Sequence, residues 1–201
     1  MDKLSYALGM SIAQNLAQSG ISDLSYEDFT MAIKDAIEGK KPALDFEEAN
    51  SVLSEYFTKK EAEMKAEQAQ VAGAFKAEGE AWLAENAGKE GVVVLESGLQ
   101  YKVLKAGNGK KPGKKDMVRC HYEGTFTNGM KFDSSYDRNE PAVFGVTQVI
   151  AGWTEALQLM SEGSEWELYI PYQLAYGEDG AHGSIPPCAA LIFKVELLEV
   201  L

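Results

Sequence analysis

The chain has 201 residues, 31 of them acidic and 19 basic, which gives a net charge of −12. Its composition, 45% hydrophobic and 25% charged, is typical of a globular protein and excludes a disordered chain. No run of about 18 apolar residues could cross a bilayer, and the acidic balance disfavours a nucleic-acid surface. We therefore expect neither nucleic acid nor membrane among its partners. The opening Met1-Asp2-Lys3 lacks the basic and apolar regions of a secretion signal. This favours the cytoplasm, with the periplasm as the alternative if a signal has been removed.

Two short amphipathic helices are predicted at the start of the chain. The first ends at Gly20, and the second begins after Ser25 as N-cap and ends at Gly39. Each carries one apolar stripe at helical spacing, formed by Leu4, Leu8, Ile12 and Leu16 in the first and by Phe29, Ile33 and Ile37 in the second.

A third, long helix is predicted after Asp45, which forms a capping-box pattern with Glu48. If it continues past Gly73 and Gly79 to Asn86, its length is about 62 Å at 1.5 Å per residue. Residues 58–70 are nearly all Lys, Glu, Gln and Ala, so we interpret this helix as a solvated stalk. A heptad coiled coil through residues 58–85 is disfavoured because sustained apolar a and d positions are missing.

The first helices are too few to bury their own stripes, because modules below about 40–60 residues are marginal alone. A second copy of the chain is the simplest partner for these stripes, and we expect a homodimer through residues 1–57. The alternative is a monomer whose helical part packs on the C-terminal domain.

Residues 91–201 contain five prolines and thirteen glycines, against one proline and six glycines in residues 1–90. Because these residues mark turns, the second part is predicted to be strand-rich. Strands are expected over 99–104, 117–126 and 130–133, the last two joined at Asn128-Gly129, and around Trp166–Ile170 and Leu191–Leu197. One short helix is expected over 151–160. The fold class is therefore α+β, with a helical module over 1–43, a connecting helix over 44–88 and a strand-rich domain over 89–201.

The usual signatures of catalysis and cofactor binding are absent from the sequence. His121 lies beside Cys120, but no further ligands stand at metal spacing. Neither a Gly-x-Ser-x-Gly elbow nor a Walker motif occurs, and the glycine-rich stretch at Gly107 has proline where a dinucleotide fingerprint needs its third glycine. We expect no metal and no cofactor. The basic segment 102–119 could contact phosphate, but a solvated hairpin is the preferred interpretation. Aromatic residues beside turns remain, and they could fill either a core or a pocket.

Residues 118–200 nevertheless resemble the FK506-binding (FKBP-type) peptidyl-prolyl cis–trans isomerase domain. The matching phrases are Val118-Arg-Cys-His-Tyr122-Glu-Gly, Lys131-Phe-Asp-Ser-Ser135, Val149-Ile-Ala-Gly-Trp153, Ala175-Tyr-Gly177, Ile185-Pro-Pro187 and Phe193-Lys-Val-Glu-Leu-Leu198. The start, with Ser5-Tyr-Ala-Leu-Gly9, looks like the dimerisation module of the bacterial Mip-like subfamily. The resemblance implies a curved antiparallel sheet wrapped on one short helix, intertwined N-terminal helices, and rotation of X–Pro bonds in proline-containing peptides and unfolded proteins.

The same resemblance assigns roles to individual residues. Trp153 forms the pocket floor beneath the proline ring, and Ile185 closes the loop side. The walls are Tyr122, Phe144, Val149, Ile150 and Phe193. Phe132 and Asp133 flank the substrate carbonyl, with Tyr122 and Arg138 orienting Asp133. The Ile150 N–H and the Tyr176 hydroxyl hydrogen-bond the peptide. Asp133 is not expected to act as a general base, because amide rotation transfers no proton.

Three positions depart from the common family pattern, namely Ala142, Ala181 and Ser184, where the family often has larger residues. They leave open how tightly macrolides such as FK506 or rapamycin bind. A second functional class also stays open. In this alternative the protein is mainly a dimeric holdase chaperone whose cleft binds unfolded clients, and isomerisation is secondary.

Overall fold

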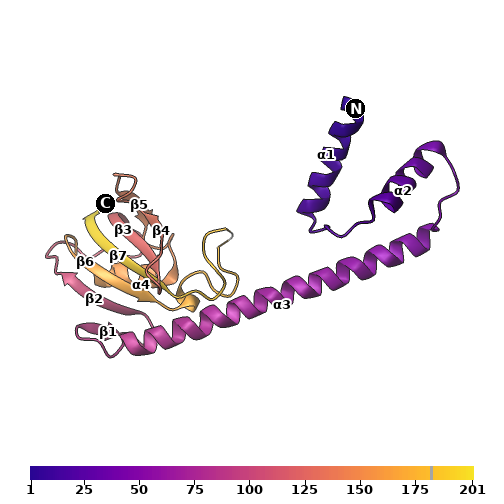
Figure 1. Ribbon diagram of the computed structural model, residues 1–201. Coiled ribbons are helices and arrows are strands. Elements are labelled where there is room, and N and C mark those ends of the chain that lie inside the picture. The colour runs from indigo at the N-terminus through magenta and orange to yellow at the C-terminus, as the bar shows by residue number, and fades with distance from the viewer. Residues whose placement is uncertain (182) are drawn as a thin grey trace. The chain divides into compact units, whose positions relative to one another are not determined.

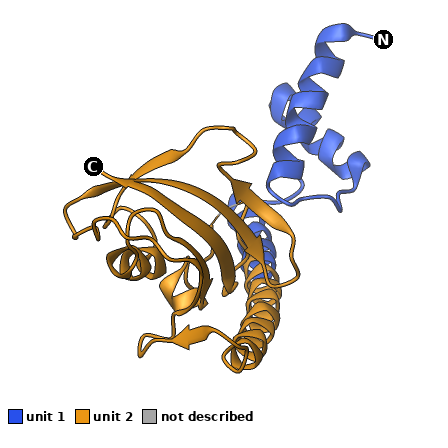
Figure 2. Cartoon of the chain, turned by 90° about the vertical axis from the view of Figure 1, so that its left-hand side faces the viewer, with its two compact units in different colours: residues 1–60 blue, residues 61–201 orange. Residues whose placement is uncertain are grey.

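The computed structural model describes residues 1–181 and 183–201. It contains two compact units, residues 1–60 and residues 61–201, which are coloured separately in Figure 2. The long helix α3 begins in the first unit and ends in the second (Figure 1). Each unit is described by itself below.

The first unit holds helices α1 (Lys3–Gln18) and α2 (Tyr26–Glu38) and the beginning of α3 (Phe46–Asn86). Side-chain caps begin all three, because Asp2, Ser25 and Asp45 each accept a hydrogen bond from the backbone N–H three residues on. Gly39 ends α2 with φ of 66°, a left-handed conformation that suits glycine. The three predicted helices, including the continuation of the third to Asn86, are confirmed.

The second unit is built on one antiparallel sheet of seven strands, which appears in Figure 1 as the group of arrows beyond the end of α3. The strands are β1 (Val92–Val94), β2 (Gln100–Lys105), β3 (Met117–Phe126), β4 (Lys131–Ser134), β5 (Ala142–Gly145), β6 (Glu165–Ile170) and β7 (Leu191–Val200). Their order is β1-β2-β6-β7-β3-β4, and β5 pairs with β3. The α+β prediction is confirmed. Strands β1 and β5 were not predicted, because they are short and, unlike β4, do not follow a hairpin signal such as Asn128-Gly129.

Helix α4 (Ala151–Leu159) packs on the sheet, because its Trp153, Ala156 and Leu157 belong to the same buried core as the strands. A 3-10 turn, η1 (Tyr172–Leu174), follows β6. Alternate residues of β3 and β7 point into the core, where Val118, Cys120, Val195 and Leu197 are fully buried. Both cysteines are free and buried, and burial raises the pKa of Cys120 to about 12.

The segment 102–119 is not a hairpin, so that interpretation was wrong. Strand β2 lies between β1 and β6, whereas β3 pairs with β4, β5 and β7. The loop between them is held instead at the turn after α4, where Gly109 N donates to Glu162 O at 3.1 Å and Glu162 N donates to Lys110 O at 2.9 Å. These contacts connect residues about 50 positions apart in the sequence, so they cannot be predicted from a local sequence pattern.

The last part of α3 is a structural element of the second unit rather than free stalk. Leu83 is buried with Tyr169 and Ala190, and Phe75 packs against the main core. The Asn86 side chain donates to Gln100 Oε1 at 3.0 Å, and Gln100 Nε2 donates to the Leu83 carbonyl at 2.9 Å. This buried polar pair ties the end of α3 to the start of β2, and it adds a second donor to the Leu83 carbonyl, which already accepts from Ala87 N at 3.0 Å.

Candidate active site

A cavity of about 450 Å³ opens between strands β3, β4, β5 and β7 and helix α4. Its lining is mostly aromatic and aliphatic, with Asp133 and Gln148 as the charged and amide side chains. The lining residues are Tyr122, Phe132, Asp133, Phe144, Gln148, Val149, Ile150, Trp153, Tyr176 and Phe193.

Trp153 lies at the centre of an aromatic cluster and is only 4% exposed. Its ring meets Tyr122, Phe144 and Phe193 nearly at right angles, with centroids 5.4–5.7 Å apart. Such edge-to-face packing fixes the orientation of all the rings involved. Among the buried side-chain nitrogen and oxygen atoms of the described residues, the Trp153 indole Nε1 is the one without a hydrogen-bond partner.

A charged triad forms the polar rim of the cavity. The Tyr122 hydroxyl donates to Asp133 Oδ2 at 2.6 Å, while Arg138 donates to Asp133 Oδ1 at 2.5 Å and to the Tyr122 oxygen at 2.7 Å. Partial burial by itself raises the pKa of Asp133, but the hydrogen bonds from Tyr122 and Arg138 outweigh it and lower that pKa overall. Burial raises the pKa of Tyr122, and its bond to Asp133 adds to this effect. At neutral pH the rim therefore holds a carboxylate, a neutral phenol and a guanidinium.

The backbone position of Tyr122 is secured from behind by Ser135, which is fully buried. Tyr122 N donates to Ser135 Oγ at 2.8 Å, and Ser135 N donates to Tyr122 O at 2.9 Å. These bonds join β3 to the end of β4, and they keep Tyr122 next to Asp133.

Two glycines allow the aromatic groups to come this close. A Cβ at Gly124 would lie 2.6 Å from Phe132 Cζ and 2.8 Å from Phe193 Cε1, and one at Gly152 would lie 2.6 Å from Ile170 Cγ2. Gly124 therefore lets two cavity rings pack over β3, and Gly152 lets α4 approach β6. Both glycines lie in sequence phrases that match the family, but only the structure shows why a side chain would not fit at either position.

The structure brings together every residue assigned to the pocket except two. Arg138 lies outside the lining and reaches the site through Asp133 and Tyr122, while Ile185 lines a different hollow. Ala142 lies in β5 opposite Cys120 and packs on the core, and Ala181 and Ser184 belong to the hollow of Ile185. Gln148 was missed, although its place directly before Val149-Ile150 in the turn leading to α4 could have indicated it.

Within the described residues, no group of three or more His, Cys, Asp or Glu side chains is arranged to hold a metal ion. None of the described helices is both long enough and apolar enough to cross a membrane.

Comparison with known families and proteins agrees with this geometry. Residues 108–198 match the family described as FKBP-type peptidyl-prolyl cis-trans isomerase, and residues 1–103 match the domain described as amino terminal to it. The chain is 48% identical to the FKBP-type 22 kDa peptidyl-prolyl cis-trans isomerase of Escherichia coli, over 98% of this chain and 94% of that protein. It is 44% identical to Outer membrane protein MIP of Legionella longbeachae, over 99% and 85%. The crystal structure of FkpA from Escherichia coli superimposes with a TM-score of 0.74 at 35% identity, covering 98% of this chain and 95% of the other. The chain therefore belongs to the FKBP-type peptidyl-prolyl cis–trans isomerases, with the amino-terminal domain of the FkpA- and Mip-like bacterial proteins.

Proposed function

We propose that the cavity over Trp153 is where this isomerase rotates X–Pro bonds of peptides and of unfolded or partly folded proteins. The observation that carries the assignment is the aromatic cluster itself, in which a buried indole is held by three rings and faces a cavity large enough for a prolyl residue. The charged triad at the rim gives this apolar cavity a defined polar side.

The physical task suits an apolar cavity. Rotation about an X–Pro bond has a barrier of about 18–20 kcal/mol because the C–N bond has partial double-bond character, and it takes tens to hundreds of seconds unaided. Twisting the bond removes the amide resonance and its charge separation. A cavity poor in water and in strong donors therefore disfavours the planar ground state relative to the twisted state. No covalent intermediate and no proton transfer is needed.

Each residue has a role in this proposal. Trp153 supports the proline ring from below, between the aromatic and aliphatic walls formed by Tyr122, Phe144, Val149, Ile150 and Phe193. Phe132 and Asp133 flank the carbonyl before proline, while Tyr122 and Arg138 hold the Asp133 carboxylate in place. The Ile150 N–H and the Tyr176 hydroxyl hold the substrate backbone in position while the bond rotates. Ile185 closes the side of the pocket that faces the neighbouring loop.

The test is the combined replacement Phe132→Ala with Asp133→Ala, assayed on a short proline peptide by NMR exchange spectroscopy. We expect the accelerated cis–trans exchange to be lost while the fold is kept. Wild-type exchange rates in this variant would show that the cavity is not the catalytic site.

The apolar stripes of the first unit support dimerisation. No residue of α1 or α2 is buried in the single chain, and Leu4 is 70% and Ile37 81% exposed. The other stripe residues, Leu8, Ile12, Leu16, Phe29 and Ile33, are exposed or only partly buried. Exposure of this much apolar surface is typical of an interface, and we propose a homodimer formed through residues 1–57. The helical module over 1–43 is joined by the helix over 44–88 to the isomerase domain over 89–201.

Analytical ultracentrifugation tests the proposed homodimer directly. Replacing Leu8 and Ile12 by Asp is expected to give a monomer that still isomerises short peptides. A dimer that persists with these charges would contradict the assigned interface.

Holdase action by the cleft of the dimer remains a second candidate, because residues 61–70 of the connecting helix are exposed and could face unfolded clients. In the Phe132→Ala, Asp133→Ala variant, suppression of aggregation should persist if holdase action is independent. Its disappearance together with isomerisation would exclude this function.

Ligand and compartment complete the proposal. FK506 or rapamycin would occupy the same cavity, and competition in the exchange assay measures their affinity.

Cytoplasmic localisation stays our proposal, with the cell envelope as the alternative because the Legionella longbeachae relative is named as an outer membrane protein. Fractionation of cells expressing the native gene separates the two.

A further inference from the structure

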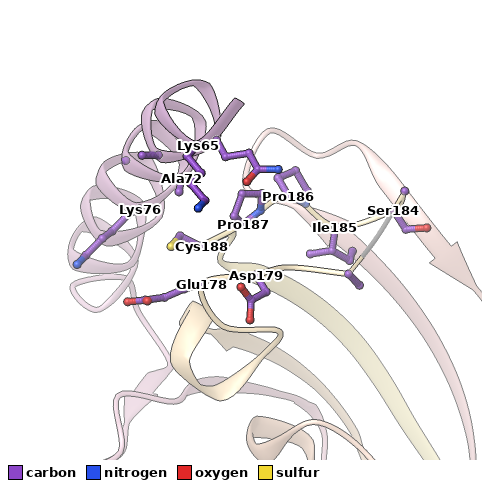
Figure 3. Close-up of a pocket in the computed structure, with 15 residues that line it drawn as sticks. Lys65, Ala72, Lys76, Glu178, Asp179, Ser184, Ile185, Pro186, Pro187 and Cys188 are labelled. Carbon is purple, nitrogen blue, oxygen red and sulfur yellow. The ribbon is translucent and has the colours of Figure 1, made fainter. Parts of the chain in front are cut away.

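A second hollow, of about 980 Å³, lies between α3 and the loop residues 178–181 and 183–188 (Figure 3). We call it the α3 groove. Its lining residues are Lys65, Gln68, Ala69, Ala72, Gly73, Lys76, Glu178, Asp179, Ala181, Gly183, Ser184, Ile185, Pro186, Pro187 and Cys188.

The helix side of the α3 groove is one face of α3, since its residues recur at spacings of three and four. The same face continues to Gly79 and Leu83, which are buried against the domain. A Cβ at Gly79 would lie 2.9 Å from Ala190 Cβ, whereas a Cβ at Gly73 would meet nothing within 4 Å. Between Gly79 and Gly73 this face of α3 therefore loses its close contact with the domain, and Ala69, Ala72 and Gly73 form the small-residue part of the space that is left.

The centre of the loop side is apolar, because Ile185, Pro186 and Pro187 line the α3 groove there. Ile185 lines the α3 groove and also belongs to the buried cluster that contains Trp153 and Phe193. The loop follows Tyr176, which lines the catalytic cavity, and Cys188 N closes it by donating to Gly177 O at 3.0 Å. The catalytic cavity and the α3 groove are therefore lined by nearby residues of one loop, Tyr176 for the cavity and Glu178 onward for the groove.

Charges of both signs surround the apolar centre, with Lys65 and Lys76 on the helix and Glu178 and Asp179 on the loop. The Lys76 ammonium lies 5.7 Å from the centre of the Tyr172 ring, which anchors it at the rim. A phosphate or an anionic lipid surface needs cations alone. Mixed charges around an apolar floor match a polypeptide, which carries both signs.

We propose that the α3 groove binds an extended segment of the polypeptide substrate next to the X–Pro bond being isomerised. The proposal rests on the proposed function of the cavity. From Lys65 to Lys76 the helix rises about 16 Å, which matches about five residues of extended chain at 3.3 Å each. The α3 groove therefore makes this isomerase prefer long substrates over short ones.

The test compares a four-residue proline peptide with the same core extended by six residues on each side, using NMR exchange spectroscopy on the full chain. We expect kcat/KM to be roughly tenfold higher for the long peptide, equivalent to about 1.4 kcal/mol of added binding. Gly73→Trp fills the α3 groove and should bring the ratio of the two values close to one. The replacement of glycine inside a helix favours folding, and Gly73→Gln serves as a smaller second variant.

The matched control is Ala74→Trp. Ala74 is exposed, does not line the α3 groove and points about 100° away from Gly73 around the helix. The Ala74→Trp variant should therefore keep the full wild-type preference for the long peptide. Equal kcat/KM for both peptides in the wild type, or an unchanged ratio in Gly73→Trp, overturns the proposal.

Two further outcomes separate the explanations. A change in sedimentation of Gly73→Trp alone would assign the α3 groove to a second copy of the chain and overturn the proposal. A different variant tests the proposed function of the cavity. If the Phe132→Ala, Asp133→Ala variant exchanges the four-residue peptide at the wild-type rate, the proposed function is wrong, whatever the α3 groove binds.

Discussion

Replacing Gly124 by alanine places a methyl group where the structure has no room for one. The new Cβ would lie 2.6 Å from Phe132 Cζ and 2.8 Å from Phe193 Cε1, against 3.4–4 Å for ordinary contact. Each ring must therefore retreat by roughly 0.6–0.8 Å. Neither ring can move away easily, because Phe193 packs edge-to-face between Phe132 and Trp153, with ring centroids 5.5 and 5.4 Å away.

The expected cost follows from this packing. Overfilling a packed core costs about 1–3 kcal/mol, which corresponds to a drop in Tm of roughly 3–10 °C for a domain of this size. Because the displaced rings form the cavity wall, kcat/KM on a short proline peptide should fall by about 10- to 100-fold, the usual effect of misplacing a binding group by about 1 Å.

Tryptophan fluorescence is the right readout for unfolding, because Trp82, Trp153 and Trp166 all lie in the second unit. Gly113→Ala is the matched control, since its Cβ would meet only Asp116 Oδ2 at 3.8 Å, and it should change neither quantity. If Gly124→Ala melts within 1 °C of the wild type and keeps kcat/KM within about twofold, the rings are not held as rigidly as this reasoning requires.

Three further changes test other parts of the molecule. In Asp133→Asn, the ratio of its kcat/KM to that of the wild type should stay constant from pH 5 to 9, because the lowered pKa of Asp133 keeps it ionised throughout; a ratio that varies near neutral pH would point to a proton-transfer role. The stability that the carboxylate adds is present above its unfolded pKa of about 3.9 and is lost as the pH falls through the lowered folded pKa, so wild-type and Asp133→Asn melting curves should converge in acid. Tyr122→Phe removes the two hydrogen bonds that its hydroxyl makes with Asp133 and Arg138 and should lower kcat/KM about fivefold, equivalent to about 1 kcal/mol. Its Tm should fall by only a few degrees, because the direct bond from Arg138 to Asp133 remains. Leu83→Ala should destabilise the second unit by about 2–3 kcal/mol in the fluorescence melt, whereas Leu53→Ala, an exposed leucine of the same helix, should not change it; equal melts would show that the end of α3 is not integral to the domain.

The local structure of this protein can be predicted along the chain. The three helices begin at Asp2, Ser25 and Asp45 because those side chains satisfy free N–H groups within three residues. Strand β3 alternates buried and half-buried residues because its side chains point to opposite faces. The family phrases also named almost all of the residues that meet around Trp153, although their individual roles remain a proposal.

How the helices and strands pack together depends on long-range contacts. The 102–119 segment has the composition of a hairpin, yet its flanking strands pair with β1, β6 and β7 instead of with each other. The polar end of α3 is buried through Asn86 and Gln100, and the separation of Ile185 from the catalytic cavity depends on the path of one loop. Caps, turns and periodicity act over a few residues and can be read along the chain. Strand order and cavity shape depend instead on contacts between residues tens of positions apart, whose energies are settled only when the whole core is packed.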